Sequence, residues 1–408
     1  MDAEKIRSYA ELIARVGANV QPGQDVVISA ELDRPEFVEM LVRECYEAGA
    51  AQVRVEWNYQ PLRLMHVKYQ TVERLGEVPE WEKQKLLERA EKLPAMIYIE
   101  SADPSGLDSL DQDKWGRSLQ LRWPVIKPIR DSMENKYQWC IAAVPGSKWA
   151  KKVFPGLPED EAVEKLWEAI LYTSRADSDG VSAWREHNAD LKCRCEYLNS
   201  LKLRRLYYKS SNGTDFSVGL IPQAQFLAGA ETVLGSGVEY NPNIPSEEVF
   251  TSPMRGDAQG IVYSTRPLSY RGTMIENFSI RFENGAVSEV HAEKGEEALR
   301  SLVNMDEGSK MLGECALVPY DSPIRNSGIM FYNTLFDENA ACHLALGDGF
   351  TGCIKDYENY TLEQCREMGI NNSMVHEDFM IGSADLDIFG ETQDGERVQI
   401  FKNGNWAF

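Results

Sequence analysis

The chain has 408 residues, more than one hydrophobic core usually supports, so two domains are expected. With 43% hydrophobic and 26% charged residues it has the composition of a globular protein, and its net charge is −21. This excess of acid argues against binding to nucleic acid or to an anionic membrane surface, because both need clustered Lys and Arg. It favours a metal cation, or a peptide with a free amino terminus, as the partner.

The first half of the chain alternates predicted helices with predicted strands. The predicted elements are a helix at 3–16, a strand at 26–28, a helix from Pro35 to Gly49, and strands at 53–57, 96–99 and 139–144. A strand, a helix and a second strand in this order form a βαβ unit. We therefore expect an N-terminal α/β domain, residues 1–195, with a largely parallel sheet flanked by helices. No GxGxxG or GxxxxGK[ST] motif follows these strands, so a nucleotide-binding loop is unsupported.

The second half has a different pattern. One long helical region is predicted over residues 158–200, and the domain boundary is placed near its end. Beyond it, Asn-Gly and Asp-Gly turns separate apolar runs and predict hairpins. These hairpins join 203–208 to 216–220, join 275–282 to 287–292, and span 392–401. We expect residues 196–408 to form a mixed or antiparallel α+β domain that carries a metal site.

The cysteines and the N-terminal stretch bear on the cellular compartment. The eight cysteines are scattered without a CxxC pair and are predicted to be buried, reduced thiols in a cytoplasmic protein. Residues 1–17 carry charges within their apolar pattern and are predicted to be neither a secretory signal nor a membrane span. No later apolar run approaches the roughly 18–20 residues that a membrane helix needs.

Candidate metal ligands gather in the last quarter of the chain, residues 314–383. Two of the five histidines, His343 and His376, lie there. The carboxylates around them are Glu314, Asp337, Glu338, Asp348, Glu377 and Asp378. Two imidazoles among carboxylates, with little lysine nearby, form the ligand mixture of a divalent metal site.

Each candidate also has an interpretation without a metal. If His376 and Asp378 lie on a strand, their side chains point to the same side, as two ligands would, or they belong to an edge strand at the surface. His343 follows an apolar stretch and could be a histidine of the core. Glu314 precedes an apolar run, where a carboxylate is costly to bury unless something positive pairs with it. The paired acids that include Glu248 follow Pro-Ser, a pattern that commonly opens a helix.

Two catalytic motifs are absent from the sequence. There is no GxSxG, so a nucleophilic serine on a strained turn is unsupported. HExxH is also absent, because His376-Glu377 has no second histidine four residues on, so the zinc chemistry of that motif is excluded.

Several ordered motifs together resemble one family over essentially the whole chain. They are PGQDVVI, AGAAQVRVEW, NGTDFSVGL, NIPSEEVFTSP, GECALVPYDSPI, NTLFDENAACHLALG and HEDFMIGS. They are similar to the aminopeptidase T, aminopeptidase S and PepS family of dinuclear metallo-aminopeptidases. The resemblance implies release of N-terminal amino acids from oligopeptides by a two-domain subunit that forms a homodimer.

The resemblance also implies a site of two divalent ions, with zinc, cobalt, manganese or magnesium as candidates. Its ligands would be Glu248, Glu314, His343, His376 and Asp378. Glu314 matches the carboxylate that touches both ions and would act as general base. Three carboxylates and a bridging hydroxide would then offset the four positive charges of the two ions.

Phe350 departs from the family pattern HxALGxxY, whose tyrosine is proposed to assist the transition state. A phenyl ring has no hydroxyl to donate, and losing one such donor costs about 10²–10³ in rate. Three outcomes are open: Tyr320 or Tyr332 substitutes, the enzyme is slower, or the protein only binds metal or peptide. A metal-dependent hydrolase of another substrate, such as a phosphoester, would need cations near the metals, for which Arg325 and Lys355 are the candidates.

Overall fold

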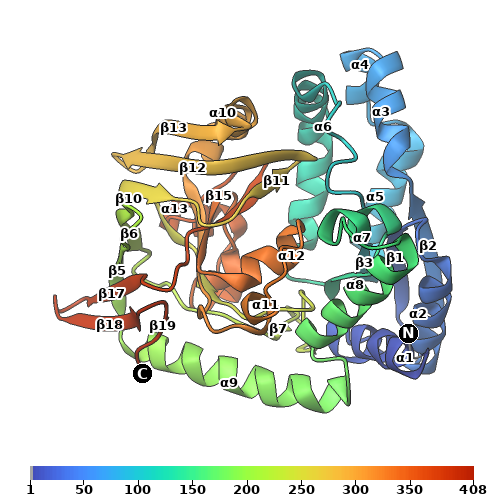
Figure 1. Cartoon of the computed structure of the whole chain (residues 1–408), viewed down its shortest axis with the longest axis horizontal. Helices are drawn as coiled ribbons and strands as arrows, with labels where there is room; N and C mark the ends of the chain where they lie inside the picture. Colours follow the sequence, from blue (N-terminus) through green and yellow to red (C-terminus); the bar gives the residue numbers. More distant parts are fainter. Residues whose placement is uncertain (1–2) are drawn as a thin grey trace. The chain divides into compact units, whose positions relative to one another are not determined.

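The computed structural model describes residues 3–408, which form two compact units (Figure 1). The first unit runs to Asn188 and includes Gly229–Ser246, and the second comprises Ala189–Ala228 and Glu247–Phe408. The segment Gly229–Ser246 joins the first unit through backbone hydrogen bonds, among them Asn241 N to Gly17 O at 2.9 Å. A division into separately folding domains after residue 195 stays a prediction.

The first unit is built on a four-stranded parallel sheet in the order β2-β1-β3-β4, which confirms the predicted parallel sheet. Its strands are β1 Asp25–Glu31, β2 Gln52–Asn58, β3 Ala95–Glu100 and β4 Trp139–Ala143. The central strand β1 contains a fully buried apolar run, Val26–Ile28, as expected where helices cover both faces of a parallel sheet. The small strands β7 Glu231–Thr232 and β8 Glu239–Tyr240 pair separately.

The helices of the first unit precede, connect and follow these strands in sequence. They are α1 Ala3–Leu12, the π-helical η1 Ile13–Gly17, α2 Pro35–Glu47, α3 Gln60–Tyr69, α4 Val72–Gly76, α5 Glu80–Lys92, α6 Gln112–Met133, α7 Ser147–Val153 and α8 Glu159–Thr173. The helix α9, Gly180–Ser200, contributes to both units. No helix among the described residues is long and apolar enough to cross a membrane.

The prediction of one helical region over residues 158–200 was wrong in one respect, because the helix is interrupted between α8 and α9. Arg175 adopts a left-handed backbone conformation, φ 53°, which a continuing helix does not allow. Asp179 then caps the next helix by accepting a hydrogen bond from Ser182 N at 3.1 Å. The indole of Trp184 donates to Ser174 O at 2.8 Å and fixes the turn.

The second unit contains a nine-stranded sheet and a smaller four-stranded sheet. The larger sheet comprises β5 Leu203–Lys209, β6 Asp215–Leu220, β10 Pro253–Tyr263, β11 Leu268–Tyr270, β12 Thr273–Glu283, β13 Ala286–Lys294, β17 Asp387–Thr392, β18 Arg397–Lys402 and β19 Asn405–Trp406. The smaller comprises β9 Val249–Thr251, β14 Leu312–Leu317, β15 His343–Gly347 and β16 His376–Met380. All pairings in both sheets are antiparallel, and the three predicted hairpins are confirmed.

Short helices connect the strands of the second unit. They are α10 Glu296–Val303, η2 Gly308–Lys310, α11 Pro323–Asn326, α12 Thr334–Asp337, η3 Glu338–Ala340, η4 Thr351–Cys353, η5 Tyr357–Asn359 and α13 Leu362–Met368. The turn η3 lies just before β15 in sequence, and His343 is the first residue of that strand.

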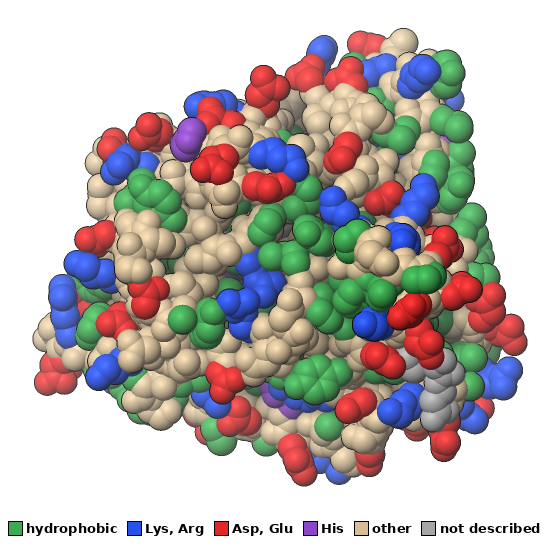
Figure 2. Space-filling model, viewed as in Figure 1, with side chains coloured by type: hydrophobic (Ala, Val, Ile, Leu, Met, Phe, Trp, Pro, Cys, Tyr) green, Lys and Arg blue, Asp and Glu red, His purple; other side chains and the backbone are tan. Residues whose placement is uncertain are grey.

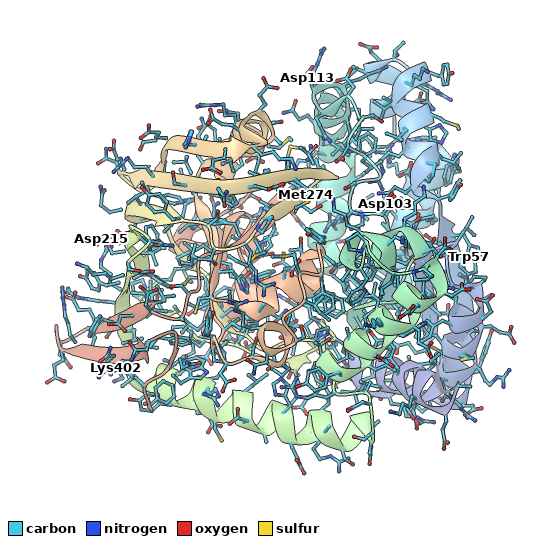
Figure 3. The ribbon with its side chains drawn as sticks, viewed as in Figure 1. Trp57, Asp103, Asp113, Asp215, Met274 and Lys402 are labelled. Carbon is cyan, nitrogen blue, oxygen red and sulfur yellow. The ribbon has the colours of Figure 1, made fainter. Side chains whose placement is uncertain are left out.

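Charged side chains cover the surface, and cysteines are mostly interior. Figure 2 shows acidic side chains interspersed with basic ones on the visible face. Asp113 on α6, Asp215 on β6 and Lys402 on β18 project outward in Figure 3. All eight cysteines are free thiols, and seven are buried, but the expectation of burial was wrong for Cys193, which faces solvent on α9.

Candidate metal centre

The candidate ligands lie on one face of the smaller sheet. Ala345 of β15 pairs with Glu314 of β14 on one side and with Asp378 of β16 on the other. Residues that pair across antiparallel strands project to the same face. The two carboxylates therefore flank a fully buried methyl group, which leaves space above the centre of the sheet.

The histidines extend the same row along the sheet. His343 pairs with Ala316, and His376 pairs with Gly347, so both imidazoles share the face of the carboxylates. Gly347 has φ +108°, and a Cβ there would lie 1.9 Å from Val375 O. Only glycine fits this position, where β15 passes closely under the segment that leads to His376.

The opposite face of the smaller sheet is apolar. Cys315, Leu344, Leu346 and Phe379 alternate with the candidate ligands along the strands and belong to the main hydrophobic cluster of the second unit. Alternation of apolar and polar residues thus fixes the register, because a slip by one residue would bury the carboxylates in that core.

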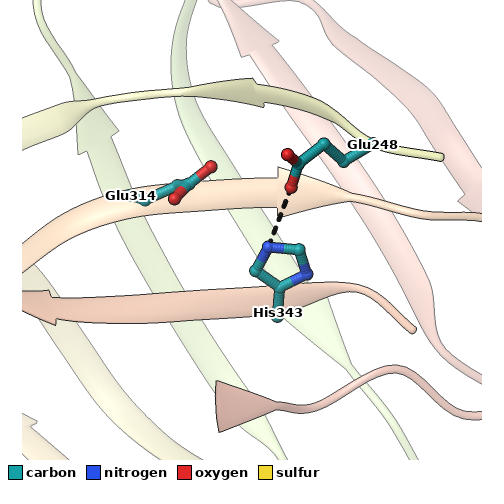
Figure 4. Close-up of side chains that lie close together, drawn as sticks. All are labelled: Glu248, Glu314 and His343. Atoms are coloured by element: carbon teal, nitrogen blue, oxygen red, sulfur yellow. Dashed lines mark ion pairs between the residues drawn. The ribbon is translucent and has the colours of Figure 1, made fainter. Parts of the chain in front are cut away.

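Glu248 reaches the site from a segment without regular structure. It directly precedes β9, whose Val249 pairs with Leu317 of β14. The alternative that its paired acids open a helix was wrong, since a strand follows them. Glu248 is buried. Figure 4 shows its carboxylate near the carboxylate of Glu314 and the imidazole of His343.

The side chains meet in two groups that share Glu314. His343 Nε2 lies 3.0 Å from Glu248 Oε2, and His376 Nε2 lies 3.1 Å from Glu314 Oε2 and 3.4 Å from Asp378 Oδ1. Ligand atoms of Glu248, Glu314 and His343 lie within 4.8 Å of one another, and so do those of Glu314, His376 and Asp378. Each group has the size and composition of a site for a divalent ion.

Backbone carbonyls orient both imidazoles toward the site. His343 Nδ1 donates to Glu338 O at 3.0 Å and to Ala341 O at 3.1 Å, while His376 Nδ1 donates to Asp348 O at 2.8 Å. A proton held on Nδ1 leaves the Nε2 lone pair free in the neutral ring. This arrangement is typical of histidines that bind metals.

The electrostatics of the cluster also favour cations. Burial, together with the nearby charges of Glu248 and Asp378, raises the pKa of Glu314 to about 7, although a hydrogen bond with His376 opposes the rise. Burial would lower the pKa of His343, but the carboxylates around it raise that pKa well above its usual value. In the metal-free protein, protons bound to these side chains therefore neutralise part of the negative charge that metal ions would otherwise neutralise.

Asp378 has an oxygen that the protein satisfies incompletely. Its Oδ1 is buried and accepts no hydrogen bond, and the nearest positive group is His376 Nε2 at 3.4 Å. A buried carboxylate oxygen without a hydrogen bond costs about 1–3 kcal/mol. The residues present therefore fit divalent ions, which would coordinate this oxygen.

Glu338 is a further buried carboxylate at the site, and the sequence suggested it only as one of several acids near the histidines. Burial first, then the charges of Asp378 and Glu248, raise its pKa well above the usual value. Its position in η3, just before His343, could have indicated it, but a turn in sequence does not reveal where its side chain points.

The remaining acids of the predicted group lie apart from it. The carboxylate of Asp337 forms a buried ion pair with Arg266 at 2.8 Å, and that of Asp348 accepts from Ser373 N at 3.0 Å. Glu377 pairs with Leu346 and so faces away from His376 and Asp378.

Phe350 lies where the family tyrosine is expected, against a candidate ligand. Its ring centroid is 4.8 Å from that of His376 and 5.5 Å from that of Phe250, and 37% of Phe350 is exposed. Of the two proposed substitutes, Tyr320 accepts a hydrogen bond from Arg325, and Tyr332 adopts a left-handed φ of 55°.

Comparison with known proteins gives matches over the full length. The family model for thermophilic metalloprotease (M29) matches residues 2–406. The chain is 42% identical to "Aminopeptidase AmpS" of Bacillus subtilis, over 100% of this chain and 99% of that protein. It is 39% identical to "Aminopeptidase T" of Thermus thermophilus, over 100% of both chains. The structure of "Wild-type AmpT from Thermus thermophilus" superposes with a TM-score of 0.88 at 38% identity, over 99% of both chains.

Proposed function

Because the chain belongs to the thermophilic metalloprotease (M29) family, we propose that it is a metal-dependent aminopeptidase that releases N-terminal amino acids from oligopeptides. The observation that carries the proposal is the pair of ligand groups joined by Glu314, one of which includes Asp378 Oδ1, a buried oxygen that accepts no hydrogen bond. The net charge of −21 adds a field that attracts metal cations and the free amine of a peptide.

We assign two divalent ions to the cluster. Glu248, Glu314 and His343 would hold one, and Glu314, His376 and Asp378 the other. When bound, such ions supply a water nucleophile near neutral pH and polarise the scissile carbonyl. Zinc, cobalt, manganese and magnesium all accept this mixture of ligands, so the choice among them is a matter for experiment.

Glu314 is our candidate for the general base. It belongs to both ligand groups, so its carboxylate lies where a water between the two ions would be deprotonated. In this role it takes a proton from the attacking water and passes it to the nitrogen of the departing peptide. The ring of Phe350 packs against His376 but offers no hydrogen-bond donor.

The proposal is tested by hydrolysis of leucine p-nitroanilide. Purified protein should lose turnover when a chelator removes its metal and regain it when cobalt, zinc, manganese or magnesium is added back. Glu391→Gln serves as a control, because Glu391 is a buried carboxylate of the larger sheet that bonds Arg204 and Tyr207. No release of nitroaniline with any of these metals, on protein that binds two ions, would overturn the proposal.

Two further expectations also need a test. One is the homodimer that the family resemblance implies, which sedimentation equilibrium would test directly. The other is the cytoplasmic location that the scattered cysteines suggest, which fractionation of the source cells would test.

A further inference from the structure

The side chain of Asn339 connects two segments of the metal centre. Asn339 is fully buried in η3. Its Oδ1 accepts a hydrogen bond from Glu247 N at 2.7 Å, while its Nδ2 donates to Leu335 O at 2.9 Å and to Glu338 Oε1 at 3.3 Å. The oxygen of this amide thus binds the segment that contains Glu247, and its nitrogen binds the turn that contains Glu338.

The first segment that Asn339 holds carries Glu248. The bond to Glu247 N fixes the backbone one residue before Glu248, in a stretch that belongs to no helix or strand. The strands of a sheet do not orient a side chain on irregular backbone. A single hydrogen bond to that backbone therefore has a large effect on where the side chain lies.

The second segment that Asn339 holds is its own turn, which orients His343. The carbonyl of Glu338 accepts the proton of His343 Nδ1 at 3.0 Å. The bonds from Asn339 Nδ2 to Leu335 O and Glu338 Oε1 hold the backbone and side chain around that carbonyl. Asn339 therefore acts on both Glu248 and His343, which lie 3.0 Å apart.

The other group of ligands is held in a different way. His376 and Asp378 both lie on β16, and Glu314 lies on β14, so the ladder of the sheet positions all three. The carbonyl that orients His376 belongs to Asp348. Asn339 reaches this group only indirectly, through Glu338, whose side chain hydrogen-bonds Asp378.

We propose that Asn339 is a positioning residue for one of the two ions, the one assigned to Glu248, Glu314 and His343. The amide preorganises this group by tying Glu248's segment to the turn that orients His343. The ladder of the sheet, rather than the amide, positions Glu314, His376 and Asp378 for the other ion. This inference rests on the proposed two-ion function.

The experiment is calorimetric titration of Zn²⁺ into protein that has been stripped with a chelator and dialysed. Asn339→Ala removes all three hydrogen bonds, and Asn339→Leu removes them while filling nearly the same space. Asn199→Ala is the matched control, because Asn199 makes the same kinds of bond to Phe226 N, at 2.7 Å, and to Phe226 O, at 3.1 Å, in the same unit. Circular dichroism establishes that each variant folds.

Both Asn339 variants should bind one ion with the affinity of the wild type and the other about 10- to 100-fold more weakly. The control should bind both as the wild type does. Combination with a ligand variant identifies the weakened ion, because coupled residues are not additive. Asn339→Ala should add no further loss in a His343→Ala background and should produce its full loss in a His376→Ala background.

Several outcomes would overturn the inference. Unchanged affinities, or an equal loss for both ions, would show that the amide does not favour one group. A full additional loss in the His343→Ala background would place its effect elsewhere. Failure of both Asn339 variants to fold, while Asn199→Ala folds, would make the amide a general requirement of the fold. A wild-type protein that binds fewer than two ions would instead overturn the proposed function, and this inference with it.

Discussion

Replacing Glu314 by glutamine should stabilise the metal-free protein at alkaline pH and disable the enzyme. The glutamine keeps the shape of the side chain but cannot ionise. In the metal-free protein, burial raises the pKa of Glu314 from its ordinary 4.5 to about 7, a rise that corresponds to about 3 kcal/mol. The folded state therefore holds a proton between these pH values that the unfolded state has released.

The sign of the effect follows from this difference in bound protons. Stability falls with rising pH wherever the folded state binds more protons, so the wild type loses stability as pH rises from about 4.5 through 7. Glu314→Gln lacks this contribution. The two proteins should be equally stable near pH 4.5, and the variant should be more stable by about 3 kcal/mol at pH 8.

Urea unfolding in the presence of a chelator, at pH 5 and pH 8, measures the difference. Glu391→Gln is a control of opposite sign, because hydrogen bonds from Tyr207 and Arg204 lower the pKa of Glu391 and its charge is stabilising above that pKa. With metal added, turnover of Glu314→Gln should fall by about 10²–10⁴. A metal-free variant no more stable than the wild type at pH 8 would refute the account of Glu314's burial, and near-normal turnover would refute its role as base.

Three other predictions concern the surroundings of the cluster. Phe350→Tyr should raise kcat for leucine p-nitroanilide, by up to about 10²-fold, because it restores a donor beside His376; an unchanged kcat would show that the hydroxyl is not limiting. Ala345→Val places methyl groups between Glu314 and Asp378, so it should abolish Zn²⁺ binding in calorimetry and lower the free energy of unfolding by about 1–3 kcal/mol. Normal Zn²⁺ binding would refute the placement of the ions above Ala345. The rise in Tm that saturating Zn²⁺ produces should grow between pH 5.5 and 8. The reason is that Glu314, whose pKa in the metal-free protein is about 7, releases a proton that competes with metal, and a rise that shrinks would contradict this.

The elements that could be predicted from the sequence are those with local signals. The βαβ order and the Asn-Gly and Asp-Gly turns indicated the parallel sheet and the hairpins. The break between α8 and α9 was missed, because the apolar residues on either side were assigned to one helical region. The polar segment between them, SRADSDG at 174–180, contains a single apolar residue and is typical of a turn. In the structure the left-handed Arg175 ends the first helix and Asp179 caps the second.

The candidate site could be predicted only in part for a similar reason. The spacing of His376 and Asp378 was enough to place them on one side of a strand, as the structure has them. The meeting of Glu314 with Asp378 across Ala345 depends on the register of strands far apart in the chain, which no local pattern specifies. Glu248 was proposed from family resemblance alone, because irregular backbone carries it to the site.

The central claim is that two ions on these side chains catalyse aminopeptidase turnover. Its most direct test is the rate of leucine p-nitroanilide hydrolysis by metal-free protein as Zn²⁺ or Co²⁺ is added in measured equivalents. Catalysis by two ions should give no turnover without metal and a rate that rises to a plateau at two ions per chain. Turnover that persists in the chelated protein, or that is already complete at one ion per chain, would contradict it.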